Sequence, residues 1–249
     1  MRVATFNVHK CVGPDGAYRP DRVAAVIAEL KADLVAVQEA DQRLGKRNGL
    51  LDPDHLLETT GMHLLSQSDL PNGHGWHGNT LLVRTKPVSY SRSRLALPGK
   101  EARGAVMADI DFGFGPIRFI ATHMGLLRNC RYQQAGAILS ALARLPPIPT
   151  VLLGDLNEWR AWRGPLKVFE PFFGRSQGCP SFPSRMPLLS LDRIMGWPHN
   201  LISEVEVHRT PLAREASDHL PVKAILRVDA MATANNDAFE AQVGMTSDA

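Results

Sequence analysis

Residues capable of acid–base and metal chemistry recur in this sequence at the ends of apolar, strand-like segments. They are Asn7, Glu39, His123, Asp155, Asn157, Asp192, Asp218 and His219. Strand ends that lie on one edge of a layered α/β domain converge in space. We therefore expect these carboxylates, amides and imidazoles to share one cleft.

Four of these side chains are carboxylates, and their shared charge sets the chemistry of the cleft. Crowded carboxylates repel one another, and a divalent cation relieves that repulsion. A set of oxygen ligands with few histidines and no thiolate suits Mg²⁺ or Mn²⁺ rather than zinc. Such an ion polarises a phosphoryl group while a carboxylate deprotonates or positions water. The residues thus predict metal-assisted hydrolysis of a phosphoester.

The elements that must position these residues alternate in a recognisable way. Residues 2–8 and 33–38 are strand-like and flank a helix that begins near Pro20, in which Val23, Val26, Ile27 and Leu30 share one face. Short strand-like segments separated by Gly/Pro/Asn turns follow, and residues 112–116 read as a hairpin loop. Further helices are predicted at 131–145 and 165–169, and further strands at 64–66, 79–84, 88–97, 104–112, 116–122, 150–154, 189–194, 202–207 and 221–228. This order favours two mixed β-sheets packed face to face, with helices outside.

Length and composition place the chain among globular proteins. Of its 249 residues 44% are hydrophobic and 21% are charged, which excludes a disordered chain. No run of about 18 apolar residues occurs, so we expect no integral membrane association. We predict a single catalytic domain over residues 1–229, a disordered tail over 230–249, and a monomer in the cytoplasm.

Taken together, the motifs resemble the endonuclease/exonuclease/phosphatase superfamily of deoxyribonucleases, apurinic endonucleases, neutral sphingomyelinases and inositol-phosphate phosphatases. The resemblance runs from Thr5-Phe6-Asn7 to Ser217-Asp218-His219-Leu220-Pro221 and includes Gly154-Asp155-Leu156-Asn157. Each motif alone is common, whereas the ordered set is specific. The resemblance implies a four-layer α/β/β/α sandwich and metal-dependent phosphoester hydrolysis.

The resemblance also implies a role for each matched position. Glu39 corresponds to the main metal ligand, with Asn7 beside it and Asp218 as a second acid of the metal region. Asp155 corresponds to the residue that orients or deprotonates water, and Asn157 to the amide that holds this nucleophile and a phosphate oxygen. His219 corresponds to the imidazole that binds the scissile phosphate, and Asp192 to the carboxylate that fixes its tautomer and favours its cationic form. His123 stands where deoxyribonuclease-like members have His and apurinic endonucleases have Tyr.

Two further residues are candidates for contact with substrate. Asn79 precedes a strand, where it either presents its amide to a phosphate or forms a structural turn. Arg103 begins a strand, where it either contacts phosphate or is solvated. Each catalytic candidate also has an ordinary structural reading, such as an Asx-turn at Asp155 and Asn157.

The sequence is less specific about the substrate. Its formal net charge is only +3, and its Lys and Arg residues are dispersed, so it lacks the strong basic patch of a duplex-DNA enzyme. We expect a small or lipid-headgroup phosphodiester or phosphomonoester, with DNA or RNA cleavage as the alternative. A non-catalytic phosphate-binding module is disfavoured because no site residue is missing. A membrane-surface enzyme would need an exposed apolar rim, for which Trp159, Trp162, Phe172 and Phe173 are candidates, although burial in the core is the more common reading.

Overall fold

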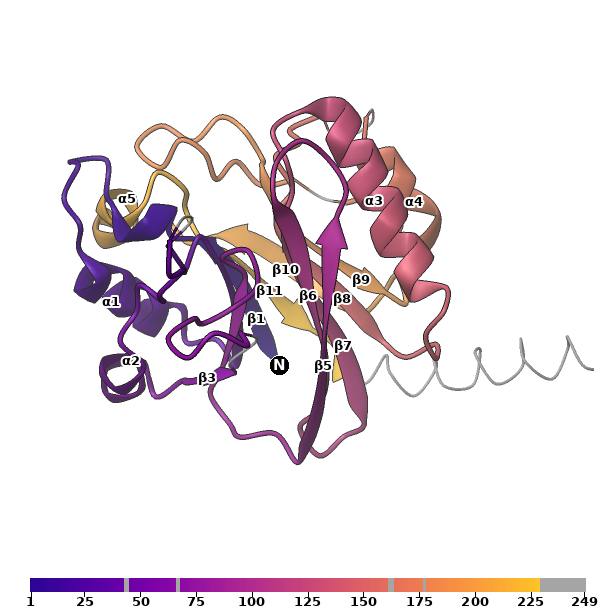
Figure 1. The fold of residues 1–249 in the computed structure, drawn as a ribbon, viewed down its shortest axis with the longest axis horizontal. Helices are drawn as coiled ribbons and strands as arrows, with labels where there is room; N and C mark the ends of the chain where they lie inside the picture. The colour runs from indigo at the N-terminus through magenta and orange to yellow at the C-terminus, as the bar shows by residue number, and fades with distance from the viewer. Residues whose placement is uncertain (43–44, 66–67, 161–163, 177, 229–249) are drawn as a thin grey trace, which may run out of the picture.

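The computed structural model describes residues 1–42, 45–65, 68–160, 164–176 and 178–228 as four layers, helices–sheet–sheet–helices (Figure 1). The first sheet has the strand order β10 (Ile202–Val207), β11 (Val222–Leu226), β1 (Arg2–Asn7), β2 (Leu34–Gln38), β4 (Thr80–Val83), β3 (His63–Leu65). The second has the order β5 (Ser89–Leu97), β6 (Arg103–Asp111), β7 (Pro116–His123), β8 (Thr150–Asp155), β9 (Asp192–Trp197). The predicted sandwich of two mixed sheets is confirmed.

Helices cover the outer face of each sheet, and three hydrophobic clusters hold the layers together. Helices α1 (Pro20–Leu30), α2 (Pro53–Thr60) and α5 (Pro211–Ala216) cover the first sheet through a cluster that includes Phe6, Ile27 and Leu56. Helices α3 (Arg128–Leu142) and α4 (Leu166–Phe173) cover the second. The central cluster joins inward-facing residues of both sheets, among them Leu34 and Phe119.

Helices α2 and α5 were not predicted because they are short and their apolar periodicity is weak. Each begins at a proline that follows a capping residue. The Asp52 side chain accepts hydrogen bonds from the backbone amides of Asp54 and His55, and the Thr210 side chain accepts one from Ala213. The caps therefore supply much of the local signal for these two helices.

The strand pairing brings the polar strand ends to one edge of the sandwich. Strands β1 and β2 are parallel and pair Asn7 with Gln38, which immediately precedes Glu39. Strands β7 and β8 are also parallel and pair His123 with Asp155, and the antiparallel strand β9 places Asp192 beside Asp155. The predicted hairpin between β6 and β7 forms at the opposite end of these strands, where Asp111 pairs with Pro116.

Of the residues considered for an exposed apolar rim, Phe172 and Phe173 of α4 pack against the core, as expected, whereas Trp159 is 51% exposed, contrary to the expected burial. Phe173 is buried, and the Phe172 ring stacks on that of Trp197 with 5.7 Å between the centroids. Trp162 and the predicted tail at 230–249 lie outside the described residues. Within the described part of the chain no helix combines the length and the apolar character needed to cross a membrane.

Candidate active site

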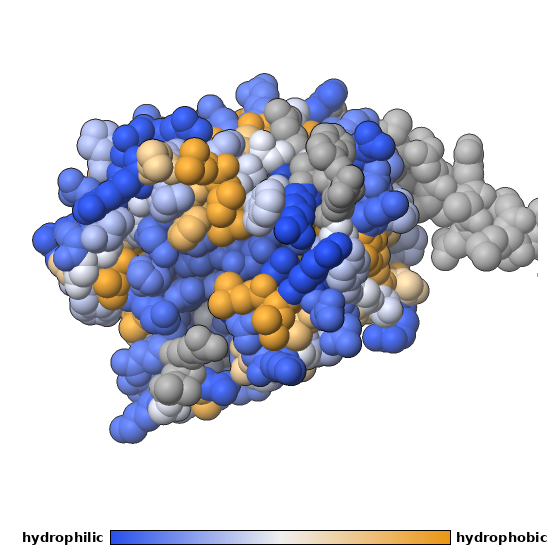
Figure 2. Space-filling model, turned by 90° about the horizontal axis from the view of Figure 1, so that it is seen from above, coloured by the Kyte–Doolittle hydropathy of each residue, from blue (hydrophilic) through white to orange (hydrophobic). Residues whose placement is uncertain are grey.

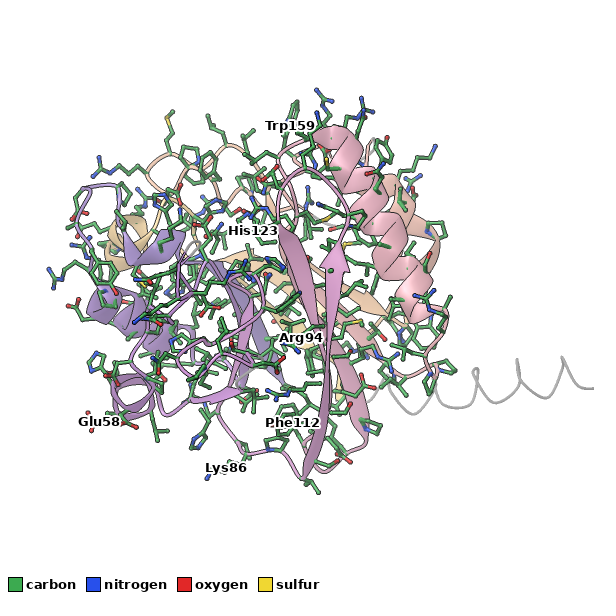
Figure 3. The ribbon with its side chains drawn as sticks, viewed as in Figure 1. Glu58, Lys86, Arg94, Phe112, His123 and Trp159 are labelled. Carbon is green, nitrogen blue, oxygen red and sulfur yellow. The ribbon has the colours of Figure 1, made fainter. Side chains whose placement is uncertain are left out.

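The second sheet supplies three adjacent polar residues to the site, and loops of the first sheet supply the rest. His123, Asp155 and Asp192 end or begin neighbouring strands, and all three are almost completely buried. His219 enters from the loop that leads into β11, and Glu39 from the turn after β2. His123 lies at the edge of the sheet facing the first sheet (Figure 3).

His219 and Asp192 form a buried hydrogen-bonded pair. The Nδ1–H group of His219 donates to Oδ2 of Asp192 at 2.9 Å, and the Ser181 hydroxyl donates to the same oxygen. Burial alone would lower the pKa of His219, but the carboxylates of Asp192 and Asp155 outweigh it and raise this pKa to about 10. His219 is therefore a cation at neutral pH, and its Nε2–H group points toward Asp155.

Asp155 lies at the centre of the site and contacts residues from both sheets. Its Oδ2 atom accepts a hydrogen bond from the Asn7 side-chain amide at 3.0 Å and lies 3.3 Å from Nε2 of His123 and 3.7 Å from Nε2 of His219. Burial raises the pKa of Asp155, but the two histidines and the donated hydrogen bonds lower it by more. Asp155 is thus a buried, ionised carboxylate.

His123 has the opposite protonation preference to His219. Burial lowers its pKa to about 4 and outweighs the attraction of Asp155 and Glu39, which Arg103 and His219 partly offset. At neutral pH the site therefore holds one cationic and one neutral imidazole. The neutral ring can donate one hydrogen bond and accept another.

Glu39 lies beside Lys10 and His123, and its side chain is partly exposed, whereas Asn7 is buried. The Glu39 carboxylate lies 3.1 Å from the Lys10 ammonium and 3.9 Å from Nδ1 of His123. Burial raises the pKa of Glu39, but the positive charges around it lower it by more. Glu39 has a positive φ of 58°, which is uncommon for this residue type and marks a position held by its surroundings.

A close backbone approach holds Glu39 in this conformation. A Cβ atom on Gly78 would lie 3.2 Å from Cα of Glu39, and the carbonyl of Gly78 accepts a hydrogen bond from the amide of Ala40. Gly78 itself has a φ of 80°. Only glycine meets both demands without strain.

Two groups of residues are candidates for holding a cation. Asp155, Asp192 and His219 have ligand atoms within 4.8 Å of one another. The cationic state of His219 and its hydrogen bond to Asp192 oppose a metal in that place. Glu39 and Asn7 fit better, because Glu39 offers an ionised carboxylate and Oδ1 of Asn7 accepts only the amide of His9 at 3.0 Å, leaving a second lone pair.

The remaining predicted residues differ in how closely they approach this centre. The backbone amide of Asn157 donates to Asp155 at 2.9 Å, and its side chain donates to the carbonyl of Met124 at 2.9 Å. Asp218 lies at the rim, 3.7 Å from Nδ1 of His9. Asn79 is fully buried and donates to the carbonyls of Trp76 and Gly104, so its observed contacts are structural. A role for Asn79 with substrate stays a prediction.

Arg103 lines a cavity that opens from the site. Its guanidinium forms an ion pair with Glu101 at 3.0 Å. The cavity has a volume of about 500 Å³, and its walls include Lys10, Glu39, Trp76, Arg94, Arg103 and His123. Arg94 lies over the Trp76 ring at 4.8 Å. Asp41 and Asp69 also line it, and Asp69 is paired with Arg94, so a cavity of this size and mixed charge accommodates a small polar molecule.

Sequence reasoning missed two serines that orient the site. Ser181 donates to Asp192, and Ser217 donates to the backbone carbonyl of Asn7 at 2.7 Å. Ser217 directly precedes Asp218 and His219, so its place in the motif was an available signal. Ser181 lies in an irregular loop, and no local pattern in the sequence distinguishes it from other serines.

A model of the Endonuclease/Exonuclease/phosphatase family matches residues 4–219. An endonuclease/exonuclease/phosphatase from Beutenbergia cavernae is 21% identical and has a TM-score of 0.66, covering 91% of this chain and 71% of that one. A mannosyl-6-phosphatase from Bacteroides thetaiotaomicron is 18% identical and has a TM-score of 0.68. The match covers 91% of this chain and 99% of that one. A humanized TDP2 from D. rerio is 16% identical and has a TM-score of 0.62. The match covers 90% of this chain and 97% of that one. No curated protein matches the sequence. At these identities the structural likeness establishes the fold.

Proposed function

Because the chain belongs to the endonuclease/exonuclease/phosphatase family, whose members include phosphatases and nucleases, we propose that it is a Mg²⁺- or Mn²⁺-dependent phosphoesterase. Its proposed substrate is a small or lipid-headgroup phosphodiester or phosphomonoester. One observation carries the proposal. A cationic His219, held by Asp192, lies 3.7 Å from the carboxylate of Asp155.

This arrangement separates an acidic and a basic function within one buried site. Asp155, ionised and buried, accepts a proton from water or orients it toward phosphorus, and Asn157 helps to hold that water. The Nε2–H group of His219 donates to a phosphoryl oxygen as negative charge develops there. Asp192 keeps His219 protonated and fixes its ring, and the neutral His123 lies 3.3 Å from Oδ2 of Asp155.

The family generally uses a divalent metal, and the donor atoms of this chain fit one. Glu39 and Asn7 would hold the ion, with Asp218 nearby, and the bound ion would polarise the phosphoryl group and neutralise its charge. The Lys10 ammonium lies 3.1 Å from the Glu39 carboxylate and balances part of its negative charge. Carboxylate and amide oxygens favour Mg²⁺ or Mn²⁺ over thiophilic metals.

The cavity beside Glu39 supports a small substrate. Its walls carry Lys10, Arg94 and Arg103 close to the site, which suits a phosphoester with a further polar or anionic group. Cleavage of DNA or RNA is the second candidate, because the family includes nucleases. A long duplex would instead require a broad basic face that neutralises many phosphates.

Hydrolysis of bis-p-nitrophenyl phosphate by the purified protein tests the proposal. We expect EDTA to abolish the activity and Mg²⁺ or Mn²⁺ to restore it. Glu39→Gln should lower the metal-dependent rate by about 10² or more, because it removes the charged ligand while keeping the shape. Glu58→Gln, on the exposed outer surface of α2, is the matched control and should leave the rate unchanged (Figure 3). Activity that persists in EDTA would contradict the metal mechanism.

A panel of natural phosphoesters then identifies the substrate class. It includes sugar phosphates, inositol phosphates, nucleotides, phosphatidylinositol, sphingomyelin, plasmid DNA and abasic DNA. We expect the highest kcat/KM for a small phosphoester or a lipid headgroup. A preference for DNA would support the nuclease alternative, and no turnover of any member would favour the phosphate-binding module.

A further inference from the structure

Exposed apolar side chains gather in the loops around the candidate active site. The described residues include twelve exposed large hydrophobic residues, and five of these lie in loops at the active-site edge of the second sheet. These five, which we call the apolar rim, are Leu126, Leu127, Trp159, Met186 and Leu188. Leu126, Met186 and Leu188 are each about two-thirds exposed (66%, 64% and 65%). Such a concentration is unusual for a surface that faces only water.

The sheet topology places the loops that carry the apolar rim at one end of the second sheet. The loop after His123 leaves β7, the loop after Asp155 leaves the parallel strand β8, and the loop before Asp192 enters the antiparallel strand β9. All three loops therefore lie at the same edge. Trp159 lies at this end of the molecule, above His123 (Figure 3). Seen from above, hydrophobic groups flank a hydrophilic hollow (Figure 2).

The charges of these loops are strongly one-sided. The described parts, 124–127, 156–160 and 178–191, contain a single acidic residue, Glu158. It is buried and paired with Arg131 at 3.1 Å. By contrast, Arg128, Arg160 and Arg185 are exposed, and Arg160 lies over the Trp159 ring at 4.8 Å. The exposed surface of these three loops and of the start of α3 is thus both apolar and positive.

We propose that the apolar rim docks onto the surface of an anionic lipid bilayer, so that a headgroup phosphoester can enter the cleft from the membrane. The leucines, the methionine and Trp159 would enter the boundary between headgroups and acyl chains, and the three arginines would contact anionic headgroups. Docking rests on the rim alone, whereas cleavage of the headgroup rests on the proposed function.

Other occupants fit these observations less well. A single-stranded nucleic acid is held by aromatic side chains that stack on bases, and the apolar rim has only Trp159 beside aliphatic residues. A second copy of the chain joined through the same surface would bring two positively charged surfaces together. An anionic bilayer matches both the aliphatic character and the charge.

Vesicle co-sedimentation of the metal-free protein in EDTA tests docking without any need for catalysis. We expect binding to vesicles of phosphatidylcholine with phosphatidylglycerol, weaker binding to phosphatidylcholine alone, and a blue shift of tryptophan emission that Trp159→Phe reduces. The triple variant Leu126→Ser/Met186→Ser/Leu188→Ser should bind at least about 10-fold more weakly, because it removes most of the inserting apolar area. Arg185→Gln should weaken binding about 5-fold and lessen its salt dependence.

A matched control comes from the opposite end of the sandwich. Val88→Ser/Phe114→Ser removes two exposed apolar side chains near the β6–β7 hairpin and should leave vesicle binding unchanged. The triple rim variant should also keep the wild-type rate on bis-p-nitrophenyl phosphate, which shows that its fold and cleft are intact.

The proposal is overturned if the wild-type protein does not sediment with anionic vesicles. It is also overturned if the triple variant binds as tightly as the wild-type protein, or if the rim substitutions weaken binding to single-stranded DNA rather than to vesicles. Vesicle binding without hydrolysis of any phosphoester would refute the proposed function and leave docking supported. Metal-dependent hydrolysis without vesicle binding would support the proposed function and refute docking.

Discussion

The substitution Asp192→Asn removes one charge from the buried pair while preserving its shape. In the native protein the pKa of His219 is about 10, against an ordinary value near 6.5. At about 1.4 kcal/mol per pH unit, that difference corresponds to roughly 5 kcal/mol of net stabilisation of the cation after the cost of burial. Asp192 supplies the larger share, because its carboxylate lies 2.9 Å from the ring and that of Asp155 lies 3.7 Å away.

We therefore expect the pKa of His219 to fall to about 8 or below in the variant, since burial is then opposed mainly by Asp155. The sign of the pH effect follows. The native histidine stays protonated up to about pH 10, whereas the variant loses the proton as the pH rises past about 8. If the cation stabilises the transition state, kcat/KM of the variant should drop about 10-fold between pH 7 and pH 9, while that of the native enzyme changes little.

Two measurements check this reasoning. A ¹H–¹⁵N NMR titration of the imidazoles in the metal-free protein gives the pKa directly, and pH–rate profiles with Mg²⁺ give its effect on catalysis. Asp54→Asn, on the exposed surface of α2, is the control and should alter neither the pKa of His219 nor the pH–rate profile. An unchanged pKa of His219 in Asp192→Asn would refute the electrostatic account. A lowered pKa with an unchanged rate profile would show that the cation does not take part in catalysis.

Three further predictions concern the surroundings of the site. His123 should remain neutral at pH 6 in the metal-free protein, because burial lowers its pKa to about 4; ¹⁵N shifts of a protonated ring at that pH would contradict this. Glu158→Gln should lower the free energy of unfolding by about 3–5 kcal/mol in urea titrations, because it leaves the Arg131 charge buried without its partner; a loss below about 1 kcal/mol would mean that the pair is already solvated. Gly154→Ala should destabilise the protein by more than about 2 kcal/mol, because its Cβ would lie 1.9 Å from the carbonyl oxygen of Thr122; a thermal unfolding midpoint equal to the native one would show that β7 and β8 separate easily.

Much of the fold could be predicted because its signals are local. Continuous apolar runs such as residues 33–38 predict buried strands, and the periodic apolar face of α1 predicts a helix from side-chain spacing alone. The short helices α2 and α5 gave no comparable signal. Their stability depends on capping by Asp52 and Thr210 and on packing against the first sheet.

The sequence by itself determined which chemical groups stand at the strand ends and in what order, because those positions follow from local patterning. Only the tertiary structure decided how they meet. Asn7 and Asp155 are 148 residues apart and are joined by a 3.0 Å hydrogen bond because the two sheets pack with their site edges aligned. The same packing buries Asn79, whose amide donates to backbone carbonyls, and leaves Leu126 and Leu188 exposed. Exposure and charge state depend on every neighbour at once, so no local pattern in the chain could have fixed them.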